Sequence, residues 1–494
     1  MEKRKGSGAK VVLGGIIGFV IMFAAVFFGV QFFTKTGIFR IPGVVYYDES
    51  LLDTEVAMLS EIFTEEVDLD KDVTITARNE LVLPELSEGE FLYQIAVPVT
   101  DFYSTETNVE VASVDEMFPN CDCGYELIDV NELDFTKKLL SINDEYYLDT
   151  FKSGAVFRII SFTSEKYTEE IEPLVAGEFD GLEFPEADEV LTLAQTGVTA
   201  LSRRMNTKIA QVGGGAYFAE NIGEFLSSFD LTHTSNESSF SSYASSTNIC
   251  SDKRFIETLT AIGLDIVELT GNHNQDCGDA SARETIDIYN ENGILIVGGG
   301  KTAAEAAVPL EIDEKGNGVT MLAYNQSTGG ATYDDTPGAN QYYEDVAARQ
   351  IKEAKARGDL VILDVQYYEC AEYDATYEKT TCDYANSSAG DQVGLFRHLI
   401  DMGADVVVGT SAHQPQTFEL YGDGVIYYGL GNLFFDQSWW PGTTRSLILV
   451  HHIYKDKLLQ TEIVPTVYDA SYQTRLMDEE TATWFLNRLI SERP

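Results

Sequence analysis

The chain of 494 residues carries 33 basic and 80 acidic side chains, so its formal net charge is −47. This acidity argues against nucleic acid as a partner, because nucleic-acid binding needs a concentrated basic surface. The length allows more than one domain, and an apolar content of 44% excludes a globally disordered chain.

The N-terminal residues differ in composition from the rest of the chain. A basic segment, 1–10, precedes an uncharged apolar run, 11–33. We expect 1–10 to be a cytoplasmic tail and 11–33 a transmembrane helix, because the run is long enough for the hydrocarbon core and basic flanks stay in the cytoplasm. A cleaved signal peptide is the alternative. The expected location is the cell membrane, as a single-pass protein whose main body is extracytoplasmic.

The six cysteines agree with an oxidising location. Cys250 and Cys277 lie on either side of one predicted helix and strand, and Cys370 and Cys382 flank a short polar loop. Both pairs are candidate disulfides. The C-x-C at 121–123 is too short for easy mutual bridging, and no nearby C-x-x-C pair or histidine completes a structural zinc site.

Residues 46–185 are predicted to form a separate, smaller α/β domain near the membrane. A helix is expected over 49–63 from its apolar spacing, and strands over 91–103 and 155–162. No chemical motif assigns a role to this domain, although ligand binding by a solute-sensing receptor is one alternative. The stretch 178–189, rich in Pro, Gly and acidic residues, marks the boundary.

Strands and helices alternate from about 190 onward, with glycine at the helix ends, which predicts α/β layers. The predicted strands at 424–432, 445–454 and 457–469 follow one another without helices. We therefore expect a layered sandwich over 190–470 with a more antiparallel second sheet. Residues 471–494 are expected to form a helical tail.

Two stretches of this region carry motifs. GLDIVELTGNHNQDCG (263–278) and GDGVIYYGLGNLFFDQ (422–437) resemble motifs of the CapA family, the capsule and poly-γ-glutamate synthesis proteins with a calcineurin-like metallophosphatase fold. The second stretch matches its motif at many positions in order. The resemblance spans about 191–468 and implies an α/β, metallophosphatase-like layered sandwich, preceded by the smaller α/β domain and the transmembrane helix.

The resemblance also implies roles for individual residues. Asn272 corresponds to a metal-ligating amide, and Glu237 and His413 to two further metal ligands. His273 corresponds to the histidine that faces the leaving group, and Asp276 is expected to orient it. Each of these residues also has an ordinary structural explanation, such as a turn or a solvated loop.

Two further positions of the family motifs line the expected cleft. Arg203 closes the G-D-x-x-x-x-R motif and would hold an anionic group of the substrate, and Asn432 is the asparagine of the L-G-N motif. Gln366 and Glu369 are expected to border the same cleft and to assist a bound ion.

Three departures from the family pattern reduce the expected ligand set. Val198 stands where the family has its first metal-binding aspartate, and Gln366 and Ser411 stand where it has histidines. Valine cannot bind a metal, and glutamine and serine are weak neutral ligands. We therefore expect at most one divalent ion.

Two functions remain open at this stage. The chain is either a membrane-anchored metal-dependent hydrolase of capsule or poly-γ-glutamate synthesis with a reduced ligand set, or a non-catalytic module that binds the surface polymer or its synthase. In the first case His273 would act as general acid. The membrane, through the N-terminal helix, and the polymer or its synthase complex are the expected partners.

Overall fold

The structure, a computed structural model, describes residues 43–494 apart from 64–66, 68, 70, 118–123, 180–181, 327–328, 368–390 and 439–440. The predicted cytoplasmic tail and transmembrane segment lie outside the described residues. Within the described part of the chain, no helix is long and apolar enough to cross a membrane.

The chain divides into two compact units, which interleave along the sequence. Among the described residues, unit 1 contains those from 43 to Ala96 together with those in 113–119 and 156–183, and unit 2 contains those in 97–112, 120–155 and 184–494. This division differs from the predicted domains of 46–185 and 190–470, because two segments of the first range cluster with the second.

Unit 1 is built on strands in the order β1-β2-β8-β3, with two helices on their apolar face. Leu59 of α2 and Val175 of α4 share a core with Ile75 and Ile160 of the strands. The predicted helix and both predicted strands are confirmed. The elements are β1 (Val45–Tyr47), α2 (Asp53–Ile62), β2 (Val73–Val82), β3 (Glu90–Asp101), β8 (Ser153–Thr163) and α4 (Glu172–Phe179).

The first sheet of unit 2 has the order β14-β13-β10-β9-β24-β25-β26, and β23 also pairs with β9. Strands β9, β10, β13 and β14 run parallel, so their carboxyl ends meet at one edge. Its strands are β9 (Leu191–Thr199), β10 (Leu231–Asn236), β13 (Ile266–Glu268), β14 (Leu295–Val297), β23 (Asn432–Phe434), β24 (Arg445–Tyr454), β25 (Lys457–Val467) and β26 (Arg475–Leu476).

The second sheet has the order β16-β17-β19-β20-β22-β21. Strands β17, β19, β20 and β22 are parallel, and the antiparallel pairs lie at the two edges. Its strands are β16 (Leu310–Glu314), β17 (Asn317–Asn325), β19 (Leu360–Gln366), β20 (Val406–Thr410), β21 (Phe418–Tyr421) and β22 (Gly424–Tyr427).

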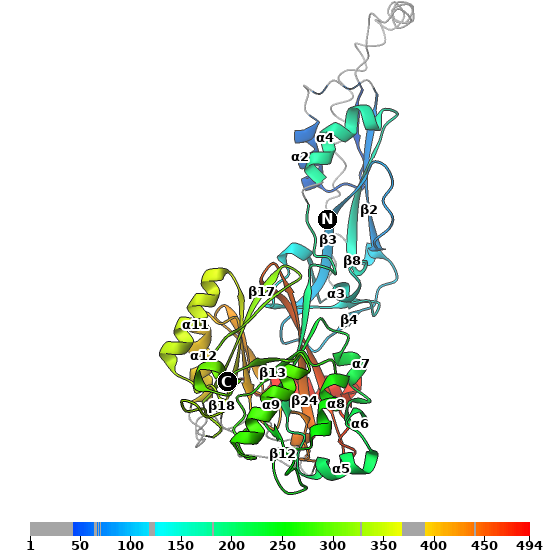
Figure 1. The fold of residues 1–494 in the computed structure, drawn as a ribbon. Helices are drawn as coiled ribbons and strands as arrows, with labels where there is room; N and C mark the ends of the chain where they lie inside the picture. The colour runs from blue at the N-terminus through cyan, green and yellow to red at the C-terminus, as the bar shows by residue number, and fades with distance from the viewer. Residues whose placement is uncertain are drawn as a thin grey trace, which may run out of the picture. The chain divides into compact units, whose positions relative to one another are not determined.

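The two sheets of unit 2 face each other and are covered by helices on their outer faces. Leu193 and Leu449 of the first sheet share a core with Ile362 and Val408 of the second. Separate cores join the first sheet to α5, α8 and α9, and the second sheet to α11 and α12. Figure 1 shows α11 and α12 on one flank of unit 2 and α6, α7 and α8 on the other.

These layers make unit 2 a four-layer α/β sandwich, in agreement with the predicted layered α/β class. The helices are α5 (Arg204–Val212), α6 (Ala216–Ala219), α7 (Gly223–Leu226), α8 (Ile256–Ala261), α9 (Asp279–Glu291), α10 (Ala303–Ala306), α11 (Glu344–Arg357), α12 (Gln392–Asp401) and α13 (Glu479–Ile490). The last of these lies in the predicted helical tail.

The prediction of a more antiparallel second sheet is wrong. The antiparallel strands β24 and β25 join the first sheet beside β9, while the second sheet is mainly parallel. They form a hairpin whose two turn residues, Lys455 and Asp456, have φ values of 50° and 61°. Positive φ at both central residues suits the right-handed twist of paired strands. The hairpin therefore extends the first sheet on the β9 side.

Candidate functional site

Polar side chains from four strand ends meet in unit 2. Glu237 follows β10, Asn272 follows β13, Gln366 ends β19 and His413 follows β20. The strands belong to two different sheets, which face each other, so residues far apart in sequence reach one place. We call Glu237, Asn272, Gln366 and His413 the site cluster.

Gln366 connects two members of the site cluster. Its side-chain Nε2 donates to Asn272 Oδ1 at 3.2 Å and lies 3.4 Å from Glu237 Oε1, while its Oε1 accepts from Thr410 Oγ1 at 3.2 Å. Gln366 and Glu237 are almost completely buried. The glutamine N–H groups therefore satisfy the oxygens that sequence reasoning assigned to a metal ion.

His413 is held in a defined orientation by Asn432. The Nδ2 of Asn432 donates to the Thr443 carbonyl oxygen at 2.9 Å, so its Oδ1 faces the imidazole. That oxygen lies 2.8 Å from His413 Nδ1, which must therefore be the protonated nitrogen. His413 Nε2 then points toward Glu237, at 3.9 Å from Oε2. The site cluster is thus continuous from Asn272 to Asn432.

The loop after β13 passes very close to Glu237. A Cβ atom at Gly271 would lie 2.7 Å from Glu237 Cα, which is shorter than side-chain packing allows. Only glycine permits this approach. Gly271 therefore brings Asn272 beside the end of β10, which explains the glycine in the G-N-H stretch.

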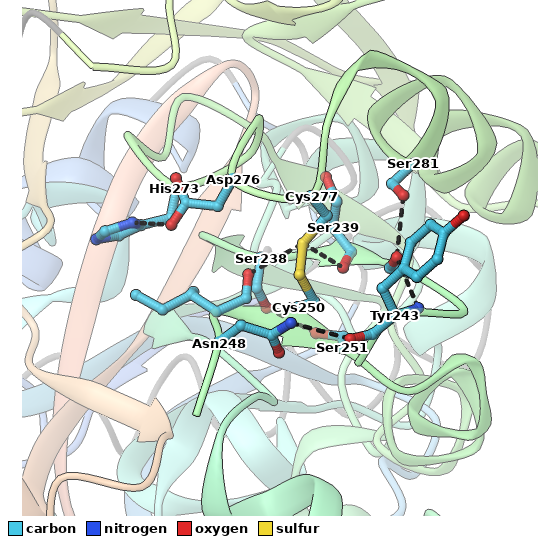
Figure 2. The surroundings of a disulfide bond; sticks show 12 residues. Ser238, Ser239, Tyr243, Asn248, Cys250, Ser251, His273, Asp276, Cys277 and Ser281 are labelled. Carbon is cyan, nitrogen blue, oxygen red and sulfur yellow. Dashed lines mark hydrogen bonds and ion pairs between the residues drawn. A yellow bond between two sulfur atoms is a disulfide. The ribbon is translucent and has the colours of Figure 1, made fainter. Parts of the chain in front are cut away.

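His273 and Asp276 form a pair beside the site cluster. His273 Nδ1 lies 2.8 Å from Asp276 Oδ2, and the histidine side chain is 30% exposed. The prediction that Asp276 orients His273 agrees with this contact, and Figure 2 shows the pair on its loop. An accessible imidazole held by a carboxylate is an arrangement suited to proton transfer.

A disulfide fixes the loop that carries His273. Cys277 is bonded to Cys250 of β12 (Cys250–Ser251), and β12 pairs with β11 (Ser239–Phe240). Ser239 also donates to the Asn274 carbonyl oxygen. Figure 2 shows the Cys250–Cys277 disulfide with Ser239 close to it. One of the two predicted disulfides is therefore confirmed, and it ties the His273 loop to the segment that follows Glu237.

Arg203 reaches the same region through aromatic packing. Its guanidinium Nη2 lies 2.7 Å from Asp436 Oδ1, and its Cζ lies 4.3 Å from the centre of the Phe435 ring. The same ring also packs against His413, at 5.1 Å between ring centres. Arg203 is therefore engaged by a buried carboxylate of this chain, an ion pair that the sequence analysis did not anticipate.

A family model described as bacterial capsule synthesis protein PGA_cap matches residues 192–437. The chain belongs to this bacterial capsule synthesis family. Its relatives include the capsule biosynthesis protein CapA of Bacillus anthracis, 24% identical over 67% of this chain and 78% of that protein. The prediction of CapA-family membership is therefore confirmed.

Another CapA relative is matched over a shorter length. The PGA biosynthesis protein CapA of Bacillus subtilis (strain 168) is 28% identical over 43% of this chain and 53% of that protein, so the match covers about half of that relative. A crystal structure of a Thermus thermophilus protein aligns with 54% of this chain at 11% identity and a TM-score of 0.30, which is too distant to support an argument.

At the positions where this capsule-family chain departs from the CapA pattern, the structure has apolar or amide packing. Val198 lies in β9 opposite Asn432 and packs with Ala200 and Phe435 in a small apolar cluster. A carboxylate at this position would be placed against the Phe435 ring. The Phe435 ring, which packs against Arg203 and His413, therefore also lies beside Val198, where the family pattern has an aspartate.

The residues present do not fit a two-ion centre. Among the described residues, no group of three His, Cys, Asp or Glu side chains is arranged to hold a metal. The site cluster offers one carboxylate, one imidazole and two neutral amides, of which Gln366 turns its N–H groups toward the other donors. Metal centres of two ions need more charged ligands than this.

A second group of polar side chains lies on β9, β10, β13 and β19, buried inside the sandwich. Asp364 Oδ1 accepts from Gln195 Nε2 at 2.7 Å, and its Oδ2 lies 3.3 Å from His233 Nε2. Burial, then the charge of Asp364, raises the pKa of Glu268 to about 7. We call Gln195, His233, Glu268 and Asp364 the interior cluster.

The sequence analysis missed the interior cluster and gave His233 no role. The sequence feature that indicates the interior cluster is the presence of charged and amide residues within apolar strands, such as Asp364 in LVILDVQ. His451 is hydrogen-bonded to Gln195 and Thr461 in the core. The predicted site residue Glu369 and the predicted Cys370–Cys382 pair lie outside the described residues.

Proposed function

We propose that this chain acts in the synthesis of a capsule or poly-γ-glutamate-type polymer as a non-catalytic module, binding the polymer or its synthase at the site cluster. The proposal includes the N-terminal membrane anchor at 11–33 and an extracytoplasmic main body. It also includes a metallophosphatase-like origin for the four-layer sandwich, whose strand-end loops provide the cleft. Family membership supports the role in capsule synthesis.

One observation favours binding over catalysis. Gln366 donates from its amide to Asn272 and faces Glu237, so the side chains expected to hold a metal already interact with each other. A buried polar group that has its hydrogen bonds within the protein gains little from an added ion. Together with Val198 in place of an aspartate, this arrangement leaves the site cluster without the ligands of a two-ion centre.

The charge of the chain limits how it would contact an acidic polymer. With a net charge of −47, a wide contact with poly-γ-glutamate would be repulsive. Recognition would therefore be local, at the half-buried His273, or would involve the synthase instead. Salt should strengthen polymer binding by screening the repulsion.

A one-ion hydrolase is the second candidate, and the contact of His413 with Glu237 favours it. Since Asn432 fixes the proton on Nδ1, the lone pair of Nε2 faces a carboxylate 3.9 Å away unless a proton or cation lies between them. Glu237, Asn272 and His413 would hold such an ion. A bound cation would polarise the scissile bond. His273, oriented by Asp276, would protonate the leaving group.

Metal analysis and activity assays separate the two candidates. Full-length protein is incubated with Zn²⁺ or Mn²⁺, desalted, and assayed for bound metal and for phosphoesterase and amide hydrolase activity, with His273→Ala as the matched variant. The module predicts no stoichiometric metal and equal background rates in both proteins. Stoichiometric metal with turnover that depends on His273 would replace the module with the hydrolase.

Binding is tested on the same preparations. Labelled poly-γ-glutamate and the polymer synthase complex are titrated with wild type, with an Asn272→Ala/His413→Ala double variant, and with Asn292→Ala as a surface control. We expect the double variant to weaken one of the two interactions at least about tenfold. Equal binding of all three proteins to both partners would contradict a role for the site cluster.

A further inference from the structure

Unit 2 contains a pocket that shares no residue with the site cluster. Its volume is about 450 Å³, within the range of small-molecule sites. The walls come from the segment 102–149, from β25 and from α13. The first two contribute most of the charged and polar lining residues, while α13 contributes a row of apolar residues together with Glu479 and Thr483.

Glu462 is the centre of the polar part. Its Oε1 lies 2.6 Å from Nε2 of the buried His452, which fixes the direction of the carboxylate. Asp149 also lines the pocket, and burial followed by the charge of Glu462 raises its pKa. Both carboxylates line the same pocket, where their negative charge favours a cation.

The only lysine among the lining residues is already engaged. Lys138 Nζ donates to the Ser104 carbonyl oxygen at 2.9 Å. Burial lowers the pKa of Lys138 to about 8, against the opposing charges of Glu106 and Glu462. Burial disfavours the charged form of this amine, and the amine already donates to a carbonyl oxygen, so it is a poor binding group for an anionic ligand.

Tyr146 adds a hydroxyl group without a partner. Its ring lies 6.1 Å from the His452 ring, and its buried Oη has no hydrogen-bond partner among the described residues. A buried hydroxyl usually accepts or donates at least one hydrogen bond. Since Tyr146 lines the pocket, a ligand group that donates a hydrogen bond would complete it.

The apolar part is formed by one face of α13 and by Met477, which precedes that helix in the chain. Ala482, Leu486 and Ile490 recur every four residues along the helix and line the pocket together with Met477. Such spacing places side chains on one helix face. These four side chains are suited to contact with a hydrocarbon chain of a few carbons, because all four are apolar.

We propose that this pocket binds a small amphipathic amine, with its ammonium group between Glu462 and Asp149 and its hydrocarbon part along α13. The ammonium would donate to the Tyr146 hydroxyl as well as to the carboxylates. The strongly negative chain would concentrate cations near the entrance. The proposal is independent of the function of the site cluster.

The test uses the full-length chain in lipid nanodiscs, titrated calorimetrically with n-hexylamine, hexanoate and n-hexanol. We expect saturable binding of n-hexylamine with a Kd below about 1 mM, and no saturable binding of hexanoate or hexanol. Glu462→Gln keeps the side-chain shape and should weaken n-hexylamine at least about tenfold, because it removes a charge-assisted hydrogen bond. If Glu462→Gln does not fold, Asp149→Asn replaces it as the test variant.

Two matched variants make the test specific. Ala482→Trp fills the apolar part and should abolish saturable binding, and its remaining signal measures partition of the amine into lipid. Asn292→Ala, at an exposed position outside the pocket lining, should bind n-hexylamine like wild type. The proposal is overturned if wild type shows no saturable binding, if hexanoate binds as tightly, or if Ala482→Trp retains the wild-type affinity.

Discussion

The site cluster and the interior cluster share strands β10, β13 and β19 but differ in how fully their polar atoms are paired. In the site cluster, the end of β20 and the start of β23 supply the partners Thr410 and Asn432. In the interior cluster, both nitrogens of His233 and one oxygen each of Glu268 and Asp364 are buried without a hydrogen-bond partner among the described residues. Polar groups at the strand ends are therefore paired more completely than polar groups between the facing sheets.

This contrast teaches that the two clusters should respond differently to substitution. Polar groups in a core are costly when a partner is removed, since no water or loop replaces it. Polar groups at strand ends often tolerate substitution, because functional positions are rarely optimised for stability. The following expectations test this difference, beginning with the largest effect.

Asp364→Ala should be the most destabilising of these substitutions, by about 3 kcal/mol, because it leaves Gln195 Nε2 without its acceptor and removes the carboxylate beside the buried His233. Glu237→Gln in the site cluster should change the free energy of unfolding by less than about 1 kcal/mol. Urea unfolding of both variants measures the difference, with Asp364→Asn as the conservative control. Equal losses for Asp364→Ala and Glu237→Gln would erase the distinction between the clusters.

Removal of the disulfide should cost about 3 kcal/mol, since it releases a loop of 27 residues in the unfolded chain. Cys250→Ser/Cys277→Ser should also loosen the His273 loop, which the bond ties to β12. Thermal unfolding and hydrogen exchange of residues 271–278 measure the two effects. Faster exchange confined to other segments would show that the bond does not hold this loop.

The interior cluster should make stability depend on pH through Glu268, whose pKa is raised to about 7 by burial and then by Asp364. The folded chain binds a proton that the unfolded chain has released between the ordinary glutamate pKa and about 7. Stability should therefore fall as pH rises through this window, by at most about 1.4 kcal/mol per unit, and stay lower above it.

Glu268→Gln removes this titration, so the slope of unfolding free energy against pH should become shallower than in wild type. Urea unfolding at a series of pH values from about 4.5 to about 8 measures it, with Glu237→Gln as the control that should retain the wild-type slope. A slope unchanged by Glu268→Gln would mean that other groups carry the dependence.

The smallest stability effect is expected for Gln366→His, below about 1 kcal/mol, because the buried position is retained at a strand end. The combined variant Val198→Asp/Gln366→His should instead gain divalent metal, since both positions would regain charged or imidazole ligands. Metal content after desalting measures it against wild type. No gain of metal would indicate that the surroundings of Phe435, and not the ligand count, prevent binding.

Much of the fold was predictable from periodicity. The helix at α9 and the strands at β9, β19 and β24 follow from apolar patterns bounded by glycine and polar residues. The sheet that receives a strand was not predictable, because β24 and β25 have the same local pattern whichever edge they extend. Their place beside β9 depends on contacts with residues more than two hundred positions earlier in the chain.

The candidate site was predictable only as a set of residues. Motif resemblance selected Glu237, Asn272 and His413, and the structure joins all three through Gln366 and direct contact. It did not reveal that Arg203 pairs with Asp436, because an arginine in a cleft motif has no preferred partner in the sequence itself. The roles in catalysis or binding stay predictions.

By itself, the sequence determined the acidic character of the chain, the alternation of strands and helices, the family and the residues at the strand ends. Each of these depends on residue type and local spacing. Only the tertiary structure decided that Gln366 turns its amide toward Glu237 and Asn272, that an apolar cluster surrounds Val198, and that carboxylates lie inside the sandwich. Hydrogen-bond direction and burial arise between segments distant in the chain, and no local pattern records them.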